Sequence, residues 1–494
     1  MGLTHILAFG AAILLARLIF HLRPAAYPRA WGWLLLVASA LAIFWLQPAV
    51  PIRNFDFYFP VATLALATLC WAVTAPPETR RERENWIAGV ALAGTVLLVA
   101  LTRYLSQTGL LTPSRPPQTL PVLVVLAAAA LLTLLLVRFT RPTPRILTAG
   151  ILVLVLVFVL LKTPALAQWS AAGLRALMGQ EAALAQSTDL RWLGFSYVAF
   201  RLIHTLRDRA TRRLPAVTLR EYLTYAIFFP AFTAGPIDRL ERFIKDLRAP
   251  APLASADLAN AGRRLLTGLF QKFVLADALA LVALSPTAAA QSTAPGWLWL
   301  MLLAYSLQIY FDFAGYTDIA IGLGLLLGIR LPENFNHPYR KPSLTQFWNN
   351  WHMTLTQWFR AYAFNPLTRA LRSNGRLPVW SIVLITQLAT MTLIGLWHGV
   401  TPGFVIWGVW HGLGLFANNR WSDWIKSRAC GRPAVAAALN ASPIPATVQR
   451  LLAAALPPMT TALTFVYVSL GWVWFALPDP ALAGRTLMRL FGLG

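Results

Sequence analysis

Two of the seven histidines in the sequence, His352 and His398, lie where a buried base could act. His398 ends an apolar run, and Gly399 after it would let another backbone or a ligand approach closely. His352 follows a stretch of tryptophan and asparagine residues. A neutral histidine can take a proton from a hydroxyl, while an amide or a second histidine steadies the developing oxyanion. This chemistry fits acyl transfer without a metal or a covalent intermediate, although the spacing alone does not select it.

Each histidine also has a purely structural interpretation. His398 could simply bond a carbonyl at a helix end, and spacing alone weighs the two readings equally. His411 lies thirteen residues later within an apolar stretch, where a packing role is favoured. Helical spacing over residues 348–359 favours an interfacial amphipathic helix, with His352 directed into a cavity as the alternative.

A metal site is not expected. Asp312 and Asp318 are six residues apart, which places them about 120° from each other on a helix. The histidines lack the usual metal-ligand spacings, and Cys70 and Cys430 are the only cysteines. We therefore predict no metal and no disulfide framework.

The composition is that of an integral membrane protein. Hydrophobic residues make up 57% of the 494 residues, and the mean hydropathy is +0.58. Apolar runs near the spanning length of about 20 residues occur at 3–22, 30–46, 57–75, 86–101, 120–139, 146–161, 297–327, 380–396, 404–416 and 462–477. With shorter candidates at 192–206, 222–235 and 270–284, the sequence predicts an all-α protein with about 11 to 13 transmembrane or re-entrant helices.

The net charge of +24 indicates membrane orientation and not nucleic-acid binding. Arginines concentrate after the first, third and fifth predicted spans: Arg23 and Arg29, then Arg80, Arg81 and Arg83, then Arg138, Arg141 and Arg145. Because positive loops stay in the cytoplasm, we expect the N-terminus to face outward.

The character of the chain changes near residue 190. Residues 1–189 are expected to form scaffold helices, 190–420 a catalytic core, and 421–494 a C-terminal transmembrane region. Residues 228–243 carry Pro230 and Pro236 in an apolar context, which predicts a broken or re-entrant helix. Residues 330–376 should fold against the cytoplasmic face.

Four motifs resemble the membrane-bound O-acyltransferase family, and specifically its bacterial branch that acylates alginate and teichoic acid. They are FFPAFTAGPI (228–237), YFDFAGYTDIAIGLGLLLGIRLPENFNHPY (310–339), FWNNWHMTLTQWFR (347–360) and GLWHG (395–399). They occur in the family's order across residues 190–420. Residues 1–189 and the stretch after Arg420 do not match the same relatives, which leaves the substrate open.

The resemblance implies a ring of helices around a tunnel, with His352 and His398 as the two functional histidines. It implies that a cytoplasmic acyl thioester, acetyl-CoA or an acyl carrier, is the donor and that no cofactor stays bound. The acceptor would be an exported polysaccharide or cell-wall glycan at the bacterial inner (plasma) membrane. A periplasmic acylesterase-like partner is also expected.

We assign His398 as the general base, while His352 orients the donor or stabilises charge. Asn349, Asn350, Trp351 and Trp397 are predicted to line the tunnel, together with Asp312 and Asp318, which more readily hold helices together. The alternatives are a lysophospholipid or lipid acyltransferase of the same family, and a transporter or flippase for a lipid-linked precursor. The second would need no particular role for His398.

Overall fold

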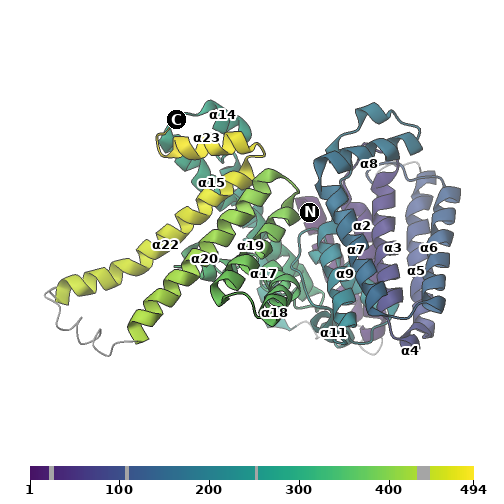
Figure 1. The fold of residues 1–494 in the computed structure, drawn as a ribbon. Coiled ribbons are helices and arrows are strands. Elements are labelled where there is room, and N and C mark those ends of the chain that lie inside the picture. The colour runs from purple at the N-terminus through teal and green to yellow at the C-terminus, as the bar shows by residue number, and fades with distance from the viewer. Residues whose placement is uncertain (22–26, 106–110, 251–253, 431–445, 494) are drawn as a thin grey trace. The chain divides into compact units, whose positions relative to one another are not determined.

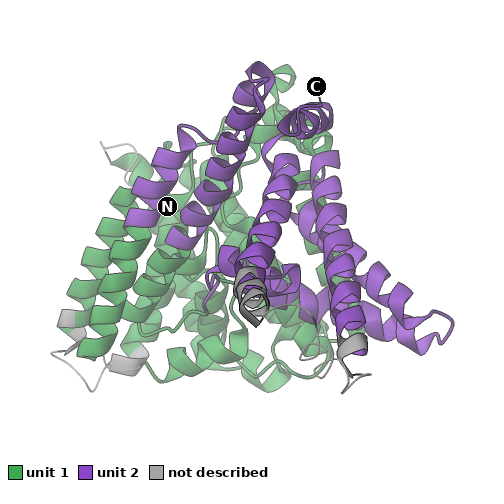
Figure 2. Cartoon of the chain, turned by 90° about the vertical axis from the view of Figure 1, so that its left-hand side faces the viewer, with its two compact units in different colours: residues 1–269, 316–332 green, residues 270–315, 333–494 purple. Residues whose placement is uncertain are grey.

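The computed structural model describes residues 1–21, 27–105, 111–250, 254–430 and 446–493, drawn in Figure 1. Every regular element in this part of the chain is a helix. Contacts divide the chain into two compact units, coloured in Figure 2. Unit 1 comprises residues 1–269 and 316–332, and unit 2 comprises residues 270–315 and 333–494.

The helices of unit 1 are α1 Leu3–His21, α2 Tyr27–Leu46, α3 Phe55–Thr74, α4 Pro77–Arg80, α5 Arg83–Leu101, α6 Thr119–Phe139, α7 Pro144–Lys162, α8 Pro164–Leu177, α9 Phe195–Ala210, α10 Leu219–Ala226, α11 Leu240–Arg248 and nearly all of α12 Ser255–Phe270. Those of unit 2 are α13 Asp277–Ala280, α14 Pro286–Gln291, α16 Leu344–Asn350, α17 Met353–Phe359, α18 Asn365–Ser373, α19 Val379–His398, α20 Pro402–Cys430, α22 Ala446–Ala476 and α23 Pro480–Leu490. The long helix α15 Pro295–Leu326 contributes to both units.

Seven helices of the described chain are long and apolar enough to cross a membrane. They cover Phe55–Thr74, Arg83–Tyr104, Thr119–Phe139, Pro144–Lys162, Pro295–Leu326, Val379–His398 and Leu456–Ala476, and shorter apolar helices cover Leu3–Arg17 and Ala30–Leu46. The predicted all-α, multi-pass architecture is confirmed. Of the shorter candidates, 192–206 corresponds largely to the sixteen-residue helix α9. The candidate at 222–235 begins in the eight-residue α10 and ends in turns, and 270–284 contains a π-helical turn followed by the four-residue α13.

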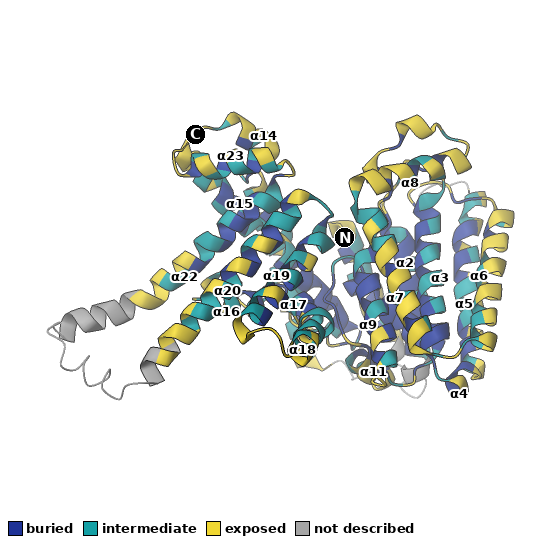
Figure 3. Ribbon diagram, in the orientation of Figure 1, coloured by how far each residue is buried: buried dark blue, intermediate teal, exposed yellow. Residues whose placement is uncertain are grey.

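Unit 1 contains apolar helices whose side chains are largely exposed. Helices α3, α5, α6 and α7 lie side by side, and α6 is exposed along most of its length (Figures 1 and 3). The exposed side chains of α6 are mainly leucine and valine, including Leu120, Val124 and Leu131. An apolar helix exposed in this way is expected to face the hydrocarbon of a bilayer.

The broken helix predicted at residues 228–243 is present in unit 1. Helix α10 ends at Ala226, a short 3₁₀ turn covers Phe229–Ala231, and the chain resumes as a helix only at Leu240. The buried guanidinium of Arg201 donates to the carbonyls of Tyr225, Ala226 and Ala231 at 3.2, 3.0 and 2.8 Å. Irregular backbone at membrane depth needs such internal partners, because lipid offers none.

In unit 2, helices α19 and α20 form a tight hairpin. A Cβ atom at Gly408 of α20 would lie 2.6 Å from the carbonyl oxygen of Met391 on α19. Only glycine therefore permits this backbone approach, which is common between membrane helices. The hairpin turn directly follows His398, so the packing of these helices places that residue.

The division into segments 1–189, 190–420 and 421–494 stays a prediction from the sequence. Arg23 lies outside the described residues, as do residues 431–445 of the last segment, and the side chains of Arg29 and Cys430 are not described. The membrane orientation remains a prediction.

Candidate active site

His352 lies at a break between two short helices of unit 2. Helix α16 ends at Asn350, and His352 is the N-cap of α17 with a left-handed backbone, φ 42° and ψ 54°. This conformation is uncommon outside glycine, although histidine and asparagine adopt it more readily than most residues. The single amphipathic helix expected over residues 348–359 is therefore wrong at this point. The break turns the His352 side chain inward, where it is only 2% exposed.

Asn334 holds the His352 ring. Its Oδ1 atom lies 3.1 Å from His352 Nδ1 and also accepts from Thr354 N and Thr354 Oγ1, at 3.2 and 2.8 Å. A backbone N–H can only donate, so the Asn334 atom facing Thr354 N must be the oxygen. His352 Nδ1 must then carry the proton, which leaves the Nε2 lone pair free to accept a proton or a hydrogen bond.

The Nε2 atom of His352 has no hydrogen-bond partner within the described chain, although it is buried. Asn334 is fully buried and its Nδ2 atom is likewise without a partner there. Buried polar groups of this kind are rare in native proteins and often mark a functional site or a bound water. The two atoms make this pair the strongest candidate for substrate contact in unit 2.

Aromatic rings surround His352. The ring of Phe313 meets it edge-on with centroids 4.6 Å apart, and Phe335 lies at 6.5 Å. Trp397 lies 6.0 Å from His352 and 4.5 Å from the neighbouring ring of His398. The structure therefore brings both predicted histidines against the same tryptophan.

His398 is the last residue of α19 and is half-buried. Its ring stacks on Phe404 with centroids 5.8 Å apart and meets Phe475 edge-on at 4.7 Å. Trp407 of α20 lies at 5.7 Å. These contacts hold the ring between α19, α20 and α22 and leave it partly accessible.

The electrostatic environment keeps His352 neutral. Burial lowers the pKa of His352 well below the usual value for histidine, and a charge on nearby His398 would lower it further. A neutral ring with Nδ1 protonated is the form in which Nε2 can accept.

The predicted tunnel-lining asparagines make local contacts. Asn349 is exposed, and its Oδ1 atom accepts from Arg360 Nη2 at 2.5 Å. Asn350 donates from Nδ2 to the carbonyl of Gln346 at 2.8 Å. Trp351 is 5% exposed and packs among aromatic rings that include Trp472, 5.3 Å away. The amides of Asn349 and Asn350 are thus engaged away from the histidine rings, while Trp397 contacts both.

The two aspartates of α15 pair with cations. Asp312, in unit 2, bonds the ammonium of Lys272. Asp318, in unit 1, lies 2.6 Å from Arg264 Nη1. Both ion pairs connect α15 to the preceding helical region, which is the helix-holding role expected as the simpler interpretation.

His411 is completely buried in the hairpin. Its ring contacts Trp407 at 4.8 Å and Trp348 at 5.1 Å, in keeping with the packing role that the sequence favours. Neither ring nitrogen has a hydrogen-bond partner within the described residues. A bound water or a small rearrangement would have to supply a hydrogen-bond partner to these ring nitrogens before His411 could take part in chemistry.

Sequence reasoning missed Asn334. It lies inside the motif LPENFNHPY, eighteen residues before His352, and nothing in its spacing links it to that histidine. An asparagine in a loop rich in proline and aromatic residues was the only available signal.

The fold and this site define a multi-pass, all-helical membrane protein in which a buried and a half-buried histidine pack among aromatic rings. The chain belongs to the membrane-bound O-acyltransferase family: the family's sequence model matches residues 147–441, more than half of the chain. The match includes Asn334, His352, Trp397 and His398.

Named relatives include three bacterial proteins. The chain is 33% identical over 303 residues to a probable alginate O-acetylase of Pseudomonas syringae pv. tomato, covering 61% of this chain and 52% of the relative. It is 33% identical over 243 residues to the teichoic acid D-alanyltransferase of Streptococcus thermophilus, covering 47% and 58%. It is 30% identical over 302 residues to the peptidoglycan O-acetyltransferase of Helicobacter pylori, covering 58% and 52%. The chain thus spans about half the length of the curated relatives that it matches.

Proposed function

We propose that this protein is a membrane-bound acyltransferase that moves an acyl group, most simply acetyl, from a cytoplasmic thioester to hydroxyls of an exported polysaccharide or cell-wall glycan. The observation that carries the proposal is the pairing of His352 and His398 across Trp397, within the segment that matches the family. The names of the relatives support an O-acetyl or related acyl group and a glycan acceptor.

His398 is proposed as the general base. In this scheme its imidazole takes the proton as the acceptor hydroxyl attacks the thioester carbonyl. The new C–O bond forms, the C–S bond breaks, and the departing thiolate recovers a proton from His398. The partial exposure of His398 suits a group that must reach substrate, and the surrounding rings of Phe404, Trp407 and Phe475 exclude water.

His352 is proposed to orient the donor. Its free Nε2 can accept a hydrogen bond from an N–H or O–H of a substrate, whereas it cannot donate one while Nδ1 holds the proton. A neutral acceptor fits the orienting role better than direct stabilisation of an oxyanion. The buried Nδ2 of Asn334 is a donor, so it can contribute to that stabilisation instead.

The acceptor side would face outward at a bacterial inner membrane, with the N-terminus on the same side. Trp351 and Trp397 would line a tunnel for the donor, which is a substrate and not a bound cofactor. A periplasmic acylesterase-like partner would complete transfer to the glycan if the transfer is a relay.

The experiment that tests the reaction class measures consumption of an acyl thioester. Membranes carrying the protein receive acetyl-CoA labelled in the acetyl group, and membranes without it serve as the control. The proposal expects label in cell-envelope glycan only where the protein is present. Label in phospholipid would indicate a lipid acyltransferase, and movement of a lipid-linked precursor without thioester consumption would indicate a transporter.

A further inference from the structure

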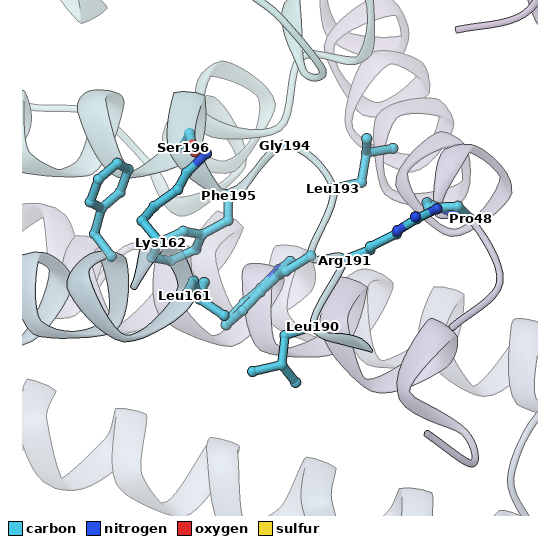
Figure 4. A pocket seen from close by; sticks show the side chains of 11 residues that line it. Pro48, Leu161, Lys162, Leu190, Arg191, Leu193, Gly194, Phe195 and Ser196 are labelled. Carbon is cyan, nitrogen blue, oxygen red and sulfur yellow. The ribbon is translucent and has the colours of Figure 1, made fainter. Parts of the chain in front are cut away.

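A cavity of about 340 Å³ lies in unit 1, away from the histidine site. It is formed where the C-terminal end of α7 meets the segment 190–194 and the start of α9 (Figure 4). Two cations line it: Lys162 reaches toward Ser196, while Arg191 extends toward Pro48 (Figure 4). The apolar part of the wall includes Phe158.

Neither cation is neutralised by an acidic side chain. The ammonium of half-buried Lys162 lies 5.9 Å from the ring centroid of Phe158, so the side chain folds back along its own helix. No carboxylate oxygen of the described residues lies within 4.0 Å of Lys162 or of Arg191, whose guanidinium is exposed. A cavity with two unpaired positive charges favours an anionic occupant.

The neighbouring helix α8 indicates where this cavity lies relative to the membrane. It begins at Pro164, two residues after Lys162, and in Figure 1 it crosses the end of the group of helices that contains α7. One face of α8 is buried through Ala167 and Ala171. The opposite face exposes Trp169 at 75%, and Leu177 at the end of the helix is 76% exposed. An amphipathic helix with exposed tryptophan lies in the interface between hydrocarbon and headgroups.

We propose that this cavity binds the phosphate diester headgroup of an anionic membrane lipid. Lys162 and the hydroxyl of Ser196 contact the phosphate, and the guanidinium of Arg191 adds positive charge on the other side of the cavity. An acyl chain follows Phe158 and Leu161, which lie about one turn and one residue before Lys162 on the spanning helix α7. A cytosolic or periplasmic anion lacks the apolar part that these residues accommodate. The inference does not depend on the proposed acyltransferase function.

The test measures lipid binding by purified full-length protein in detergent, using native mass spectrometry with phosphatidylglycerol. We expect Lys162→Gln to bind about fivefold more weakly than wild type, and the double variant Lys162→Gln/Arg191→Gln more weakly still, since each cation near a membrane surface contributes about that factor. Lys162→Arg keeps the charge and should bind as wild type. Diacylglycerol with the same chains should not compete.

Arg53→Gln is the matched control. Arg53 is exposed, and its backbone N–H bonds Gln180 just after α8, so it lies near the same end of the bundle without lining the cavity. Its removal should leave lipid binding unchanged. Equal affinity of wild type and Lys162→Gln, both folded by thermal melting, would overturn the proposal. So would glycerol phosphate competing at the same concentration as the lipid, or an acidic oligosaccharide binding where the lipid does not.

Discussion

Oδ1 of Asn334 lies 3.1 Å from Nδ1 of His352, and this contact determines which nitrogen of the ring carries the proton. The backbone N–H of Thr354 fixes the orientation of the amide, so the protonation of His352 follows from a backbone hydrogen bond. The free Nε2 atom faces a buried, aromatic environment.

Replacing Asn334 tests the role of that amide. Asn334→Leu removes the acceptor for His352 Nδ1 and Thr354 N, and leaving buried donors unpaired costs about 1–3 kcal/mol each. We expect a lower melting temperature and at least about a tenfold loss of acyl transfer. Asn334→Asp keeps the acceptor oxygen, so it should be more stable than Asn334→Leu. Equal activity of Asn334→Leu and wild type would show that the contact does not matter for function.

The backbone at His352 dictates how that residue should be replaced. Asn tolerates the left-handed conformation, and its side-chain amide can still donate to Asn334. His352→Asn therefore removes Nε2 with little backbone strain, and we expect a folded protein that loses transfer about 100-fold or more. His337 is an exposed residue with φ 46°, so His337→Asn is the matched control and should stay active. Similar activity in both variants would remove His352 from the mechanism.

The protonation of His352 also predicts how stability depends on pH. The folded pKa of His352 lies well below that of an unfolded histidine, near 6.5. The contribution of neutral His352 to the free energy of unfolding is fully present above about pH 6.5. It falls as the pH decreases, because the unfolded chain binds a proton that the folded ring does not. The slope reaches at most about 1.4 kcal/mol per pH unit.

Thermal melting of wild type and His352→Asn between pH 7.5 and 5 measures this contribution. The wild type should lose stability more steeply on acidification, whereas contributions from other histidines cancel between the two proteins. Parallel curves would mean that His352 is not buried in its neutral form.

The hairpin of α19 and α20 provides a structural prediction. At Gly408 a Cβ atom would meet the backbone of Met391 at 2.6 Å, so Gly408→Ala should separate the helices that hold His398. We expect a loss of stability of about 1–3 kcal/mol, together with reduced activity. Gly89 of α5 has open space around it, and Gly89→Ala should be neutral or stabilising by up to about 1 kcal/mol. Thermal melting of the two variants side by side checks this difference.

The sequence predicted the elements of this fold better than the details of its site. The apolar runs identify the spanning helices because composition and length alone determine whether a segment suits a bilayer. The prolines at 230 and 236 likewise predicted the interruption after α10, although not the buried Arg201 that satisfies its carbonyls.

The geometry of the site depends on a backbone break and on contacts between residues far apart in the sequence, which hydrophobic periodicity does not predict. His352 faces inward because the chain breaks at a left-handed residue between α16 and α17, whereas helical spacing continued through that point. Its partner Asn334 belongs to a loop, and Trp397 reaches it from another helix. The sequence context and the family motifs both singled out His398 and His352, whereas the contact of both rings with Trp397 emerged only from tertiary packing.

The most direct test of the central claim compares His398→Phe with wild type at matched protein levels in transfer of labelled acetyl from acetyl-CoA to envelope glycan. Phenylalanine preserves the ring packing against Phe404 and Phe475 but has no nitrogen to take a proton. We predict a folded variant whose transfer falls by at least about 100-fold. Transfer at the wild-type rate by a folded His398→Phe would contradict the assignment of His398 as the general base.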